Sequence, residues 1–443
     1  MYSRNQRLLS YMPIPLTIEQ LREIPKVDPP LIARIGAGIP GSSLQEQSNV
    51  PLEEAIQIVR TIAHKTGTET ISVDEADGRI LSETIHAPTD LPGFDRSTMS
   101  GYAIIASDIA DASESNPCYL TLIGIVHRGV SESERIHHGQ AIAIQTGGKL
   151  PEGGDVVVNS EVCTVEGDQV RITHPLAPYS NVLQKDEDFK KNEAVYPAGW
   201  EVRPQDIGVL ASIGKVRVKV LKKPVIGIIS TGRELVPSES IPKSGEVREV
   251  NSYLISAFCK RQGAIPVRYG IVRDDAEVLT SLLREASLEC DAIIVSGGSA
   301  RDQHDITAQV IHTLGKVYTE GISFAPDKRT TIGKIGTVLV IGLPGHPSAT
   351  FMVLTLVVIH LIQAMKGSPS QRIYRKQVVL TDHLCAGRDS DRYIRVSITD
   401  EYASPVFGKA GLIHMLSQSD GIVRVPAGSE GYREGDRVEV MTW

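Results

Sequence analysis

Four apolar, β-branched runs in the second half of the chain limit its possible folds most. They read PVIGIIS, AIPVRYGIV, DAIIVSG and TVLVIGL, and they lie between residues 224 and 343. Continuous apolar runs of this length are typical of parallel strands that helices cover on both faces. Helical stretches such as SYLISAFCKRQ and DDAEVLTSLLREAS lie between the runs, and we expect Asn251 to cap the first of these helices. The alternation predicts an open α/β sheet for residues 223–367.

The rest of the chain predicts several smaller units. Residues 91–180 alternate short β-type runs with turn residues, which predicts a small all-β domain. Residues 50–90 and 181–222 mix helical stretches with short strands and predict one discontinuous, elongated α/β domain. Residues 368–443 hold short strand-like runs and turns, which predict a C-terminal β-barrel. Residues 1–49 form an N-terminal extension to which we assign no role. The expected fold class is therefore multidomain α/β plus β.

Charge and cysteine spacing argue against several protein classes. The chain has 46 basic and 53 acidic residues, a net charge of −7, whereas a general nucleic-acid binder carries a basic surface. Its five cysteines lie far apart, without the clustering of a zinc site or a disulfide framework. The longest apolar stretch, Phe351–Met365, is too short to span a bilayer and contains His360, so it predicts a buried helix. We expect a cytoplasmic protein that binds neither nucleic acid nor membranes.

Glycine-rich turns follow three of the four predicted parallel strands. They are Ser230–Glu234, Ser296–Ser299 and Gly342–Pro347. The carboxyl ends of parallel strands meet at one edge of the sheet, where open α/β proteins bind ligands. Glycine lets the backbone approach closely, and its N–H groups can hold an anion. The three turns together predict a phosphate- or oxyanion-binding crevice, although the glycine patterns of P-loop and dinucleotide-binding proteins are absent from the sequence.

Charged residues accompany these turns. Glu249 lies just before the helix that follows the first turn, and Asp302 and Asp305 follow the second. Carboxylates beside bound phosphates commonly hold Mg²⁺, so these acids are candidate magnesium ligands. Lys328 and Arg329 can pair with a phosphate or another oxyanion. Solvated loop residues remain the alternative interpretation for all of them.

Six motifs occur in the order found in one enzyme family. They are LPGFDRSTMSGYA, TGGKLPEGGDVVV, DEDF, STGRELV, SGGS followed by an aspartate, and GLPGHP. From about Val50 onward the chain resembles the molybdopterin molybdotransferases, which include the gephyrin E domain. The resemblance implies an elongated homodimer of four-part subunits with a molybdopterin-binding-like central domain. It also implies Mg²⁺-dependent insertion of molybdate into adenylylated molybdopterin (molybdopterin-AMP), with release of AMP.

The resemblance assigns roles to residues and partners. Glu249, Glu187, Asp188 and Lys328 would be catalytic, and Glu249 and Asp305 would hold Mg²⁺. The pterin nucleotide and molybdate would contact Arg96, Ser100, Thr146, Thr231, Gly232, Ser296, Gly297, Gly298, Ser299, Pro344, Gly345, His346, Pro347 and Ser348. A molybdopterin adenylyltransferase and molybdoenzyme apoproteins are the implied protein partners.

The chain departs from the usual family pattern at several of these positions. The differences are Arg96 for Asn, Ser100 for Asp, Glu249 for Asp, Ala300 for Ser, Asp302 for Gly, Ala325 and Asp327 within a turn that usually holds two lysines, His346 for Asn and Ala349 for Ser. Hydroxyl and ammonium groups are lost, and negative charge is gained. Three hypotheses therefore stay open: a molybdotransferase with a remodelled site, a non-catalytic pterin-nucleotide binder or scaffold, and an enzyme for another oxyanion, such as tungstate, or another nucleotide.

Overall fold

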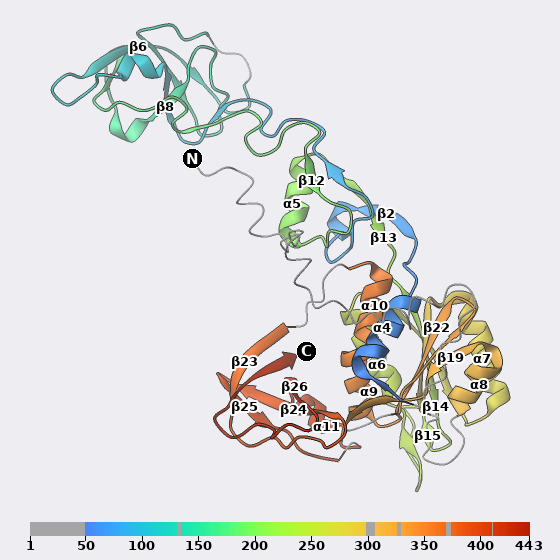
Figure 1. Cartoon of the computed structure of the whole chain (residues 1–443). Helices are drawn as coiled ribbons and strands as arrows, with labels where there is room; N and C mark the ends of the chain where they lie inside the picture. Colours follow the sequence, from blue (N-terminus) through green and yellow to red (C-terminus); the bar gives the residue numbers. More distant parts are fainter. Residues whose placement is uncertain (1–48, 131–133, 298–305, 326–328, 369–373, 410) are drawn as a thin grey trace, which may run out of the picture. The chain divides into compact units, whose positions relative to one another are not determined.

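The computed structural model describes residues 49–130, 134–297, 306–325, 329–368, 374–409 and 411–443. Two compact units contain them (Figure 1). One comprises the described parts of Met1–His64, Lys223–Met365 and Gln371–Trp443, and the other those of Lys65–Lys222 and Lys366–Ser370. The five-part division suggested by the sequence stays a prediction, and almost all of the extension 1–49 lies outside the described residues.

A six-stranded sheet forms the centre of the first unit. Its order is β17 (Ile265–Val272), β14 (Val225–Thr231), β18 (Ala292–Gly297), β22 (Val338–Leu343), β21 (Thr331–Ile335) and β19 (Lys316–Thr319). The first four strands are parallel, which confirms the open α/β prediction. The sequence did not predict β21 and β19, which are antiparallel and make the sheet mixed. Gly336, at φ 57°, turns the chain between β21 and β22.

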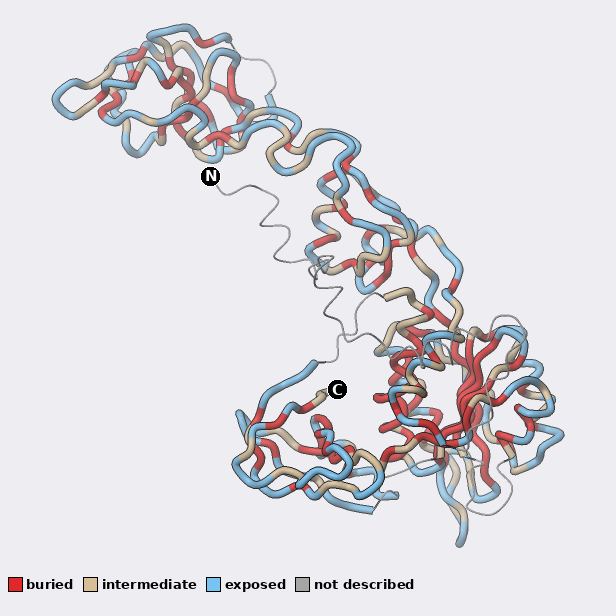
Figure 2. Tube along the Cα trace, viewed as in Figure 1, coloured by how far each residue is buried: buried red, intermediate tan, exposed pale blue. Residues whose placement is uncertain are grey.

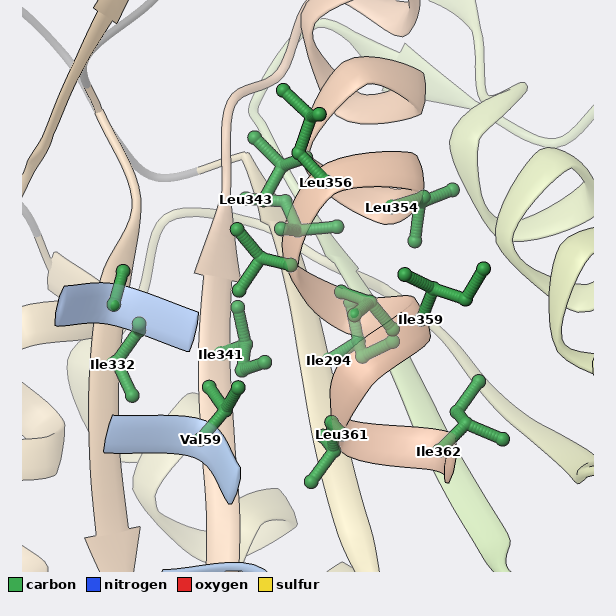
Figure 3. Close-up of a cluster of buried hydrophobic side chains, with 14 of the residues drawn as sticks. Val59, Ile294, Ile332, Ile341, Leu343, Leu354, Leu356, Ile359, Leu361 and Ile362 are labelled. Carbon is green, nitrogen blue, oxygen red and sulfur yellow. The ribbon is translucent and has the colours of Figure 1, made fainter. Parts of the chain in front are cut away.

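Helices cover both faces of this sheet (Figure 1). One face packs against α4 (Leu52–Ile62), α6 (Asn251–Arg261), α9 (Pro347–Val353) and α10 (Ile359–Lys366), and the other against α7 (Ala276–Glu289) and α8 (Ile306–Leu314). Alternate strand residues serve the two faces, as Ile294 and Ile293 of β18 do. Figure 3 shows Ile294 and Ile341 of the sheet among Leu354, Leu361 and Ile362 of the helical layer. This double burial explains why the strands are continuous apolar runs.

The apolar stretch Phe351–Met365 lies in the core, as predicted. It belongs to a helical segment, Pro347–Lys366, that is long and apolar enough to cross a membrane, but most of that segment is buried inside the protein (Figure 2). Leu354–Val358, between α9 and α10, forms a π-helical turn.

Buried His360 gives the first unit a pH-dependent stability. Its Nδ1 lies 2.9 Å from Arg60 Nη2, and burial together with the Arg60 charge lowers the pKa of His360 to about 4. Below pH 6.5 the unfolded chain binds a proton there that the folded chain does not, so the free energy of unfolding falls as the pH drops from 6.5 towards 4. We expect a loss of about 2 kcal/mol from this group between pH 7 and pH 5.

The variant His360→Gln tests this expectation. Its amide oxygen can still accept from Arg60, but it does not titrate. Urea unfolding at pH 7 and pH 5 should show a smaller loss of stability in the variant than in the wild type. Equal losses in the two proteins would contradict a neutral, buried His360.

Helix α6 corrects one prediction from the sequence. Asn251 is its first residue rather than its cap, and Val250 at the N-cap position makes no side-chain hydrogen bond. Glu249 takes the capping role, because its Oε1 accepts from the Ser252 backbone N–H at 2.7 Å. The Asn251 amide instead donates to Ser296 and Gly345, in two other segments. Sequence reasoning could not see this competition, because both partners lie far along the chain.

A five-stranded barrel completes the first unit and confirms the predicted C-terminal β-barrel. Its order is β24 (Asp391–Thr399), β25 (Tyr402–Pro405), β23 (Tyr374–Leu380), β27 (Arg437–Thr442) and β26 (Gly421–Val425), and β26 pairs with β24 to close it. The short helix α11 (His414–Ser417) lies between β25 and β26. The short strand β20 (Ile322–Ala325) pairs in parallel with both β24 and β1 (Val50–Pro51), joining the barrel to the rest of the unit. Phe324 of β20 meets Tyr393 of β24 edge-on at 5.8 Å.

The second unit holds two groups of strands. A six-stranded sheet, in the order β8 (Val156–Asn159), β5 (Gly101–Ile104), β7 (Gln140–Ile144), β6 (Cys118–Val126), β10 (Gln169–Ile172) and β9 (Thr164–Glu166), forms the predicted all-β part. Helix α5 (Pro204–Ser212) packs with two-stranded ribbons of β2 (Thr68–Ser72) with β13 (Arg217–Leu221), and β3 (Ile85–His86) with β12 (Ala194–Tyr196). A further ribbon joins β4 (Arg96–Ser97) to β11 (Val182–Leu183).

Candidate functional site

A pocket of about 700 Å³ lies at the carboxyl ends of the parallel strands. This strand-end pocket is defined by the last residues of β14 and β18 and by the turn after β22: Ser230, Thr231, Ser296, Gly297, Gly345 and His346. From β14 the chain first adds β17 on one side and then returns to add β18 on the other. The pocket therefore lies where the strand order reverses, the place where open α/β sheets bind ligands.

Most of the predicted turn residues meet at this pocket. Those lining it are Thr231, Gly232, Ser296, Gly297, Gly345, His346 and Pro347. Pro344 of the same turn and Ser348 at the start of α9 are buried, and the Pro344 carbonyl oxygen accepts from Thr350 Oγ1 at 2.5 Å. Gly298, Ser299, Asp302, Asp305 and Lys328 lie outside the described residues.

Gly297 shows why glycine is required at the end of β18. Its φ is 97°, a region that L-residues rarely adopt. A Cβ on Gly297 would lie only 2.1 Å from the Thr231 carbonyl oxygen. The ends of β14 and β18 can therefore approach this closely only with glycine at this position.

Glu249 lies in the pocket wall but is largely occupied by the protein itself. Its side chain is buried, and Oε1 accepts from Ser230 Oγ at 3.0 Å and from the Ser252 backbone N–H. Its Oε2 accepts from Ser252 Oγ at 2.5 Å. A carboxylate has about four acceptor positions, so roughly one remains for a ligand or a metal ion.

Sequence reasoning missed Asp274. This residue follows β17, lines the pocket, and accepts a hydrogen bond from Thr231 Oγ1 at 3.0 Å. Arg233 lies 3.8 Å from the same carboxylate. The strand-end rule, applied to β17 as it was to the other three strands, would have found Asp274.

Arg395 is a second missed residue, and it is a buried cation. It lies on β24 of the barrel, is 9% exposed, and donates through Nη1 to Ser348 Oγ. Its Nε has no hydrogen-bond partner, and no carboxylate among the described residues forms an ion pair with it. Burial lowers the pKa of the Arg395 guanidinium. An unpaired buried arginine favours binding of an anion.

The barrel also reaches the strand-end pocket. Gly411 and Ile413 line it, and a Cβ on Gly411 would lie 3.8 Å from His346 Cδ2. The pocket therefore has a polar wall from the strand ends and a further wall from the barrel of the same chain.

In the second unit, the other predicted residues lie on or near the segment of residues 91–100. Ser100 Oγ lies 3.1 Å from Thr146 Oγ1, and both residues are exposed. The neighbouring loops are joined, because the Gly147 backbone N–H donates to the Ser97 carbonyl oxygen at 2.8 Å, directly beside Arg96.

The acidic pair approaches the same segment. The Asp188 backbone N–H donates to the Leu91 carbonyl oxygen at 2.9 Å, and Glu187 Oε2 accepts from the Gln184 backbone N–H. Arg96 and Asp188 are exposed.

The fold and the pocket define an α/β protein with a polar pocket at its strand ends. Comparison with known proteins narrows this class. Residues 50–214 match the "MoeA N-terminal region (domain I and II)", residues 227–364 the "Probable molybdopterin binding domain", and residues 377–443 the "MoeA C-terminal region (domain IV)".

Individual relatives point to the same family as these three matches. A protein of Methanocaldococcus jannaschii named for molybdopterin biosynthesis is 32% identical over 88% of this chain and 97% of its own. A molybdopterin molybdenumtransferase of Bacillus subtilis is 28% identical over 90% and 95%. The solved MoeA protein of Pyrococcus horikoshii matches with a TM-score of 0.80 and 30% identity, over 89% of this chain and all of that one. The chain belongs to the MoeA family of molybdenum cofactor biosynthesis proteins, and its central domain is the family's molybdopterin-binding domain.

Proposed function

We propose that the chain inserts molybdate into adenylylated molybdopterin and releases AMP, in a Mg²⁺-dependent reaction. The observation that carries this proposal is the strand-end pocket, which has backbone N–H and hydroxyl groups on one wall. It lies beside a buried arginine that has no ion-pair partner among the described residues. A phosphate-linked pterin needs the first feature, and a metal oxyanion needs the second.

Arg395 is our candidate for binding molybdate. Ser348, which accepts from its Nη1, directly follows Pro347 of the pocket lining. The guanidinium thus lies beside the turn that would hold the ligand, with hydrogen-bonding capacity to spare. In this chain the turn that usually holds two lysines keeps only Lys328. We propose that Arg395 and Lys328 together supply the positive charge that binds molybdate.

The site is compatible with Mg²⁺ if the protein supplies only one or two of its ligands. No three acidic, histidine or cysteine side chains gather as a metal site within the described ranges. However, Mg²⁺ is commonly held by one or two carboxylates, waters and substrate phosphates. We propose that Glu249 and Asp305 hold it, where the ion would neutralise charge on the phosphates. Glu249 has about one acceptor position left for this purpose.

The second unit would complete the reaction in a homodimer. We propose that Arg96, Ser100 and Thr146 contact the substrate and that Glu187 and Asp188 assist catalysis. We propose that the protein acts in the cytoplasm. A molybdopterin adenylyltransferase would supply its substrate, and molybdoenzyme apoproteins would take its product.

A second candidate function is binding of the pterin nucleotide without metal insertion. The capping role of Glu249 favours it, because a carboxylate that holds α6 in place is less free to act on a ligand. An enzyme for tungstate or another nucleotide is the remaining alternative.

AMP release tests the proposal. Purified protein is incubated with adenylylated molybdopterin, with or without MgCl₂ and molybdate. We expect AMP only when both are present. Tight binding without AMP release would favour the non-catalytic alternative, and AMP release with tungstate alone would indicate a different oxyanion.

A further inference from the structure

Asn251 joins three segments of the strand-end pocket. From the start of α6, its Nδ2 donates to Ser296 Oγ near the end of β18 and to the Gly345 carbonyl oxygen after β22, both at 2.8 Å. All three residues line the pocket. A carbonyl oxygen can only accept, so the Gly345 contact requires the NH₂ group of the amide to face it. The orientation of the Asn251 side chain is thereby fixed.

This orientation determines what the Ser296 hydroxyl can do. Ser296 Oγ uses a lone pair to accept from Asn251, so its own proton remains to be donated. None of the described residues accepts that proton. Because Ser296 is 2% exposed, bulk water is a poor alternative partner. With no acceptor in the described part of the chain, the Ser296 hydroxyl is available to donate to a ligand atom that carries a lone pair.

In this orientation one polar atom of the Asn251 side chain is left unsatisfied. Its Oδ1 is buried and has no hydrogen-bond partner within the described ranges. Buried unpaired polar atoms are uncommon in folded proteins and are expected at functional sites. The hydroxyl oxygens of Thr307 and Thr330 are also buried without a hydrogen-bond partner among the described residues. Each of these threonines is next in sequence to a residue of the pocket lining, Ile306 or Arg329.

We propose that Asn251 is a positioning residue that makes Ser296 a dedicated donor to an anionic oxygen of the bound ligand. The ligand class is a phosphate ester, and the inference rests on the proposed function, which places the adenylate phosphate at this edge. Asn251 acts through Ser296 and also holds the Gly345 turn against β18.

A double-mutant cycle tests this coupling. AMP with MgCl₂ serves as the probe, and its affinity is measured by calorimetry for wild type, Ser296→Ala, Asn251→Ala and the double variant. We expect each single variant to bind about tenfold more weakly, since one hydrogen bond to a charged group is lost. The double variant should bind little more weakly than either single variant, because Asn251 has no hydroxyl left to direct.

Two further variants sharpen the test. Asn251→Asp places an acceptor beside Ser296 and should draw its proton away from the ligand, so it should bind AMP more weakly than Asn251→Ala. Ser256→Ala removes a buried hydroxyl from the same helix, outside the pocket lining, and should leave AMP affinity unchanged. Melting temperatures are recorded for all variants.

The outcomes separate the inference from the proposed function. Additive losses in the cycle, or losses that only follow the melting temperature, would mean a merely structural Asn251 and overturn the inference. Unchanged affinity in Ser296→Ala would do the same. A wild type that binds no AMP at all would contradict the proposed function and the inference together.

Discussion

Replacement of Arg395 by methionine is expected to weaken the response to molybdate strongly while leaving the fold intact. The guanidinium is buried, and no described residue supplies it with a carboxylate partner, so the folded protein loses little when a similar-sized apolar side chain takes its place. An oxyanion that it binds would lose charge-assisted hydrogen bonds worth about 1.5–3 kcal/mol each. We expect the rate of AMP release at low molybdate to fall about 100-fold.

Arg392→Met is the matched control on the same strand. Arg392 donates to the Cys385 carbonyl oxygen and does not line the strand-end pocket. Its replacement should leave both the molybdate dependence and the melting temperature close to those of wild type. If Arg395→Met kept the wild-type dependence on molybdate, Arg395 would not be the oxyanion ligand.

Replacement of Gly297 by alanine is expected to disrupt both stability and ligand binding. The φ of 97° costs a non-glycine residue about 1–3 kcal/mol, and the new Cβ would clash with the Thr231 carbonyl oxygen at 2.1 Å. The ends of β14 and β18 must then separate, which displaces donors in the pocket wall. We expect the free energy of unfolding to fall by about 3 kcal/mol and AMP affinity to fall at least tenfold.

Gly345→Ala provides the comparison within the same pocket. Among the described residues a Cβ there would meet Gly297 Cα, at 3.7 Å, which is an ordinary contact distance. Its stability should stay within about 0.5 kcal/mol of wild type. Urea unfolding and calorimetry with AMP measure both effects. A mild Gly297→Ala variant would show that the close approach of the two strands is not needed.

The parts of the fold that were predictable share one property: their local sequence pattern is strong. Strands β14, β18 and β22 are apolar on both faces, so their residues are continuous apolar runs. Strands β19 and β21 are short and contain lysine, and they gave no comparable pattern. Their place at the sheet edge follows from a turn at Gly336 and from pairing, which are not visible in a single segment.

The candidate site divides in the same way. Its glycine-rich turns were predictable because they follow recognisable strands. Arg395 was not, because its partner Ser348 lies 47 positions away and nothing in RYIRVSIT marks one arginine as buried. The role of Asn251 was mistaken for capping, because Glu249, two residues earlier, competes for the helix terminus.

The most direct test of molybdenum transfer is the metal content of the pterin product. After a single turnover of adenylylated molybdopterin with protein, MgCl₂ and molybdate, the product is separated from protein and free molybdate, and its molybdenum is measured by mass spectrometry. The proposed function predicts about one molybdenum per AMP released, and little of either with Arg395→Met. AMP release into a metal-free pterin would contradict it.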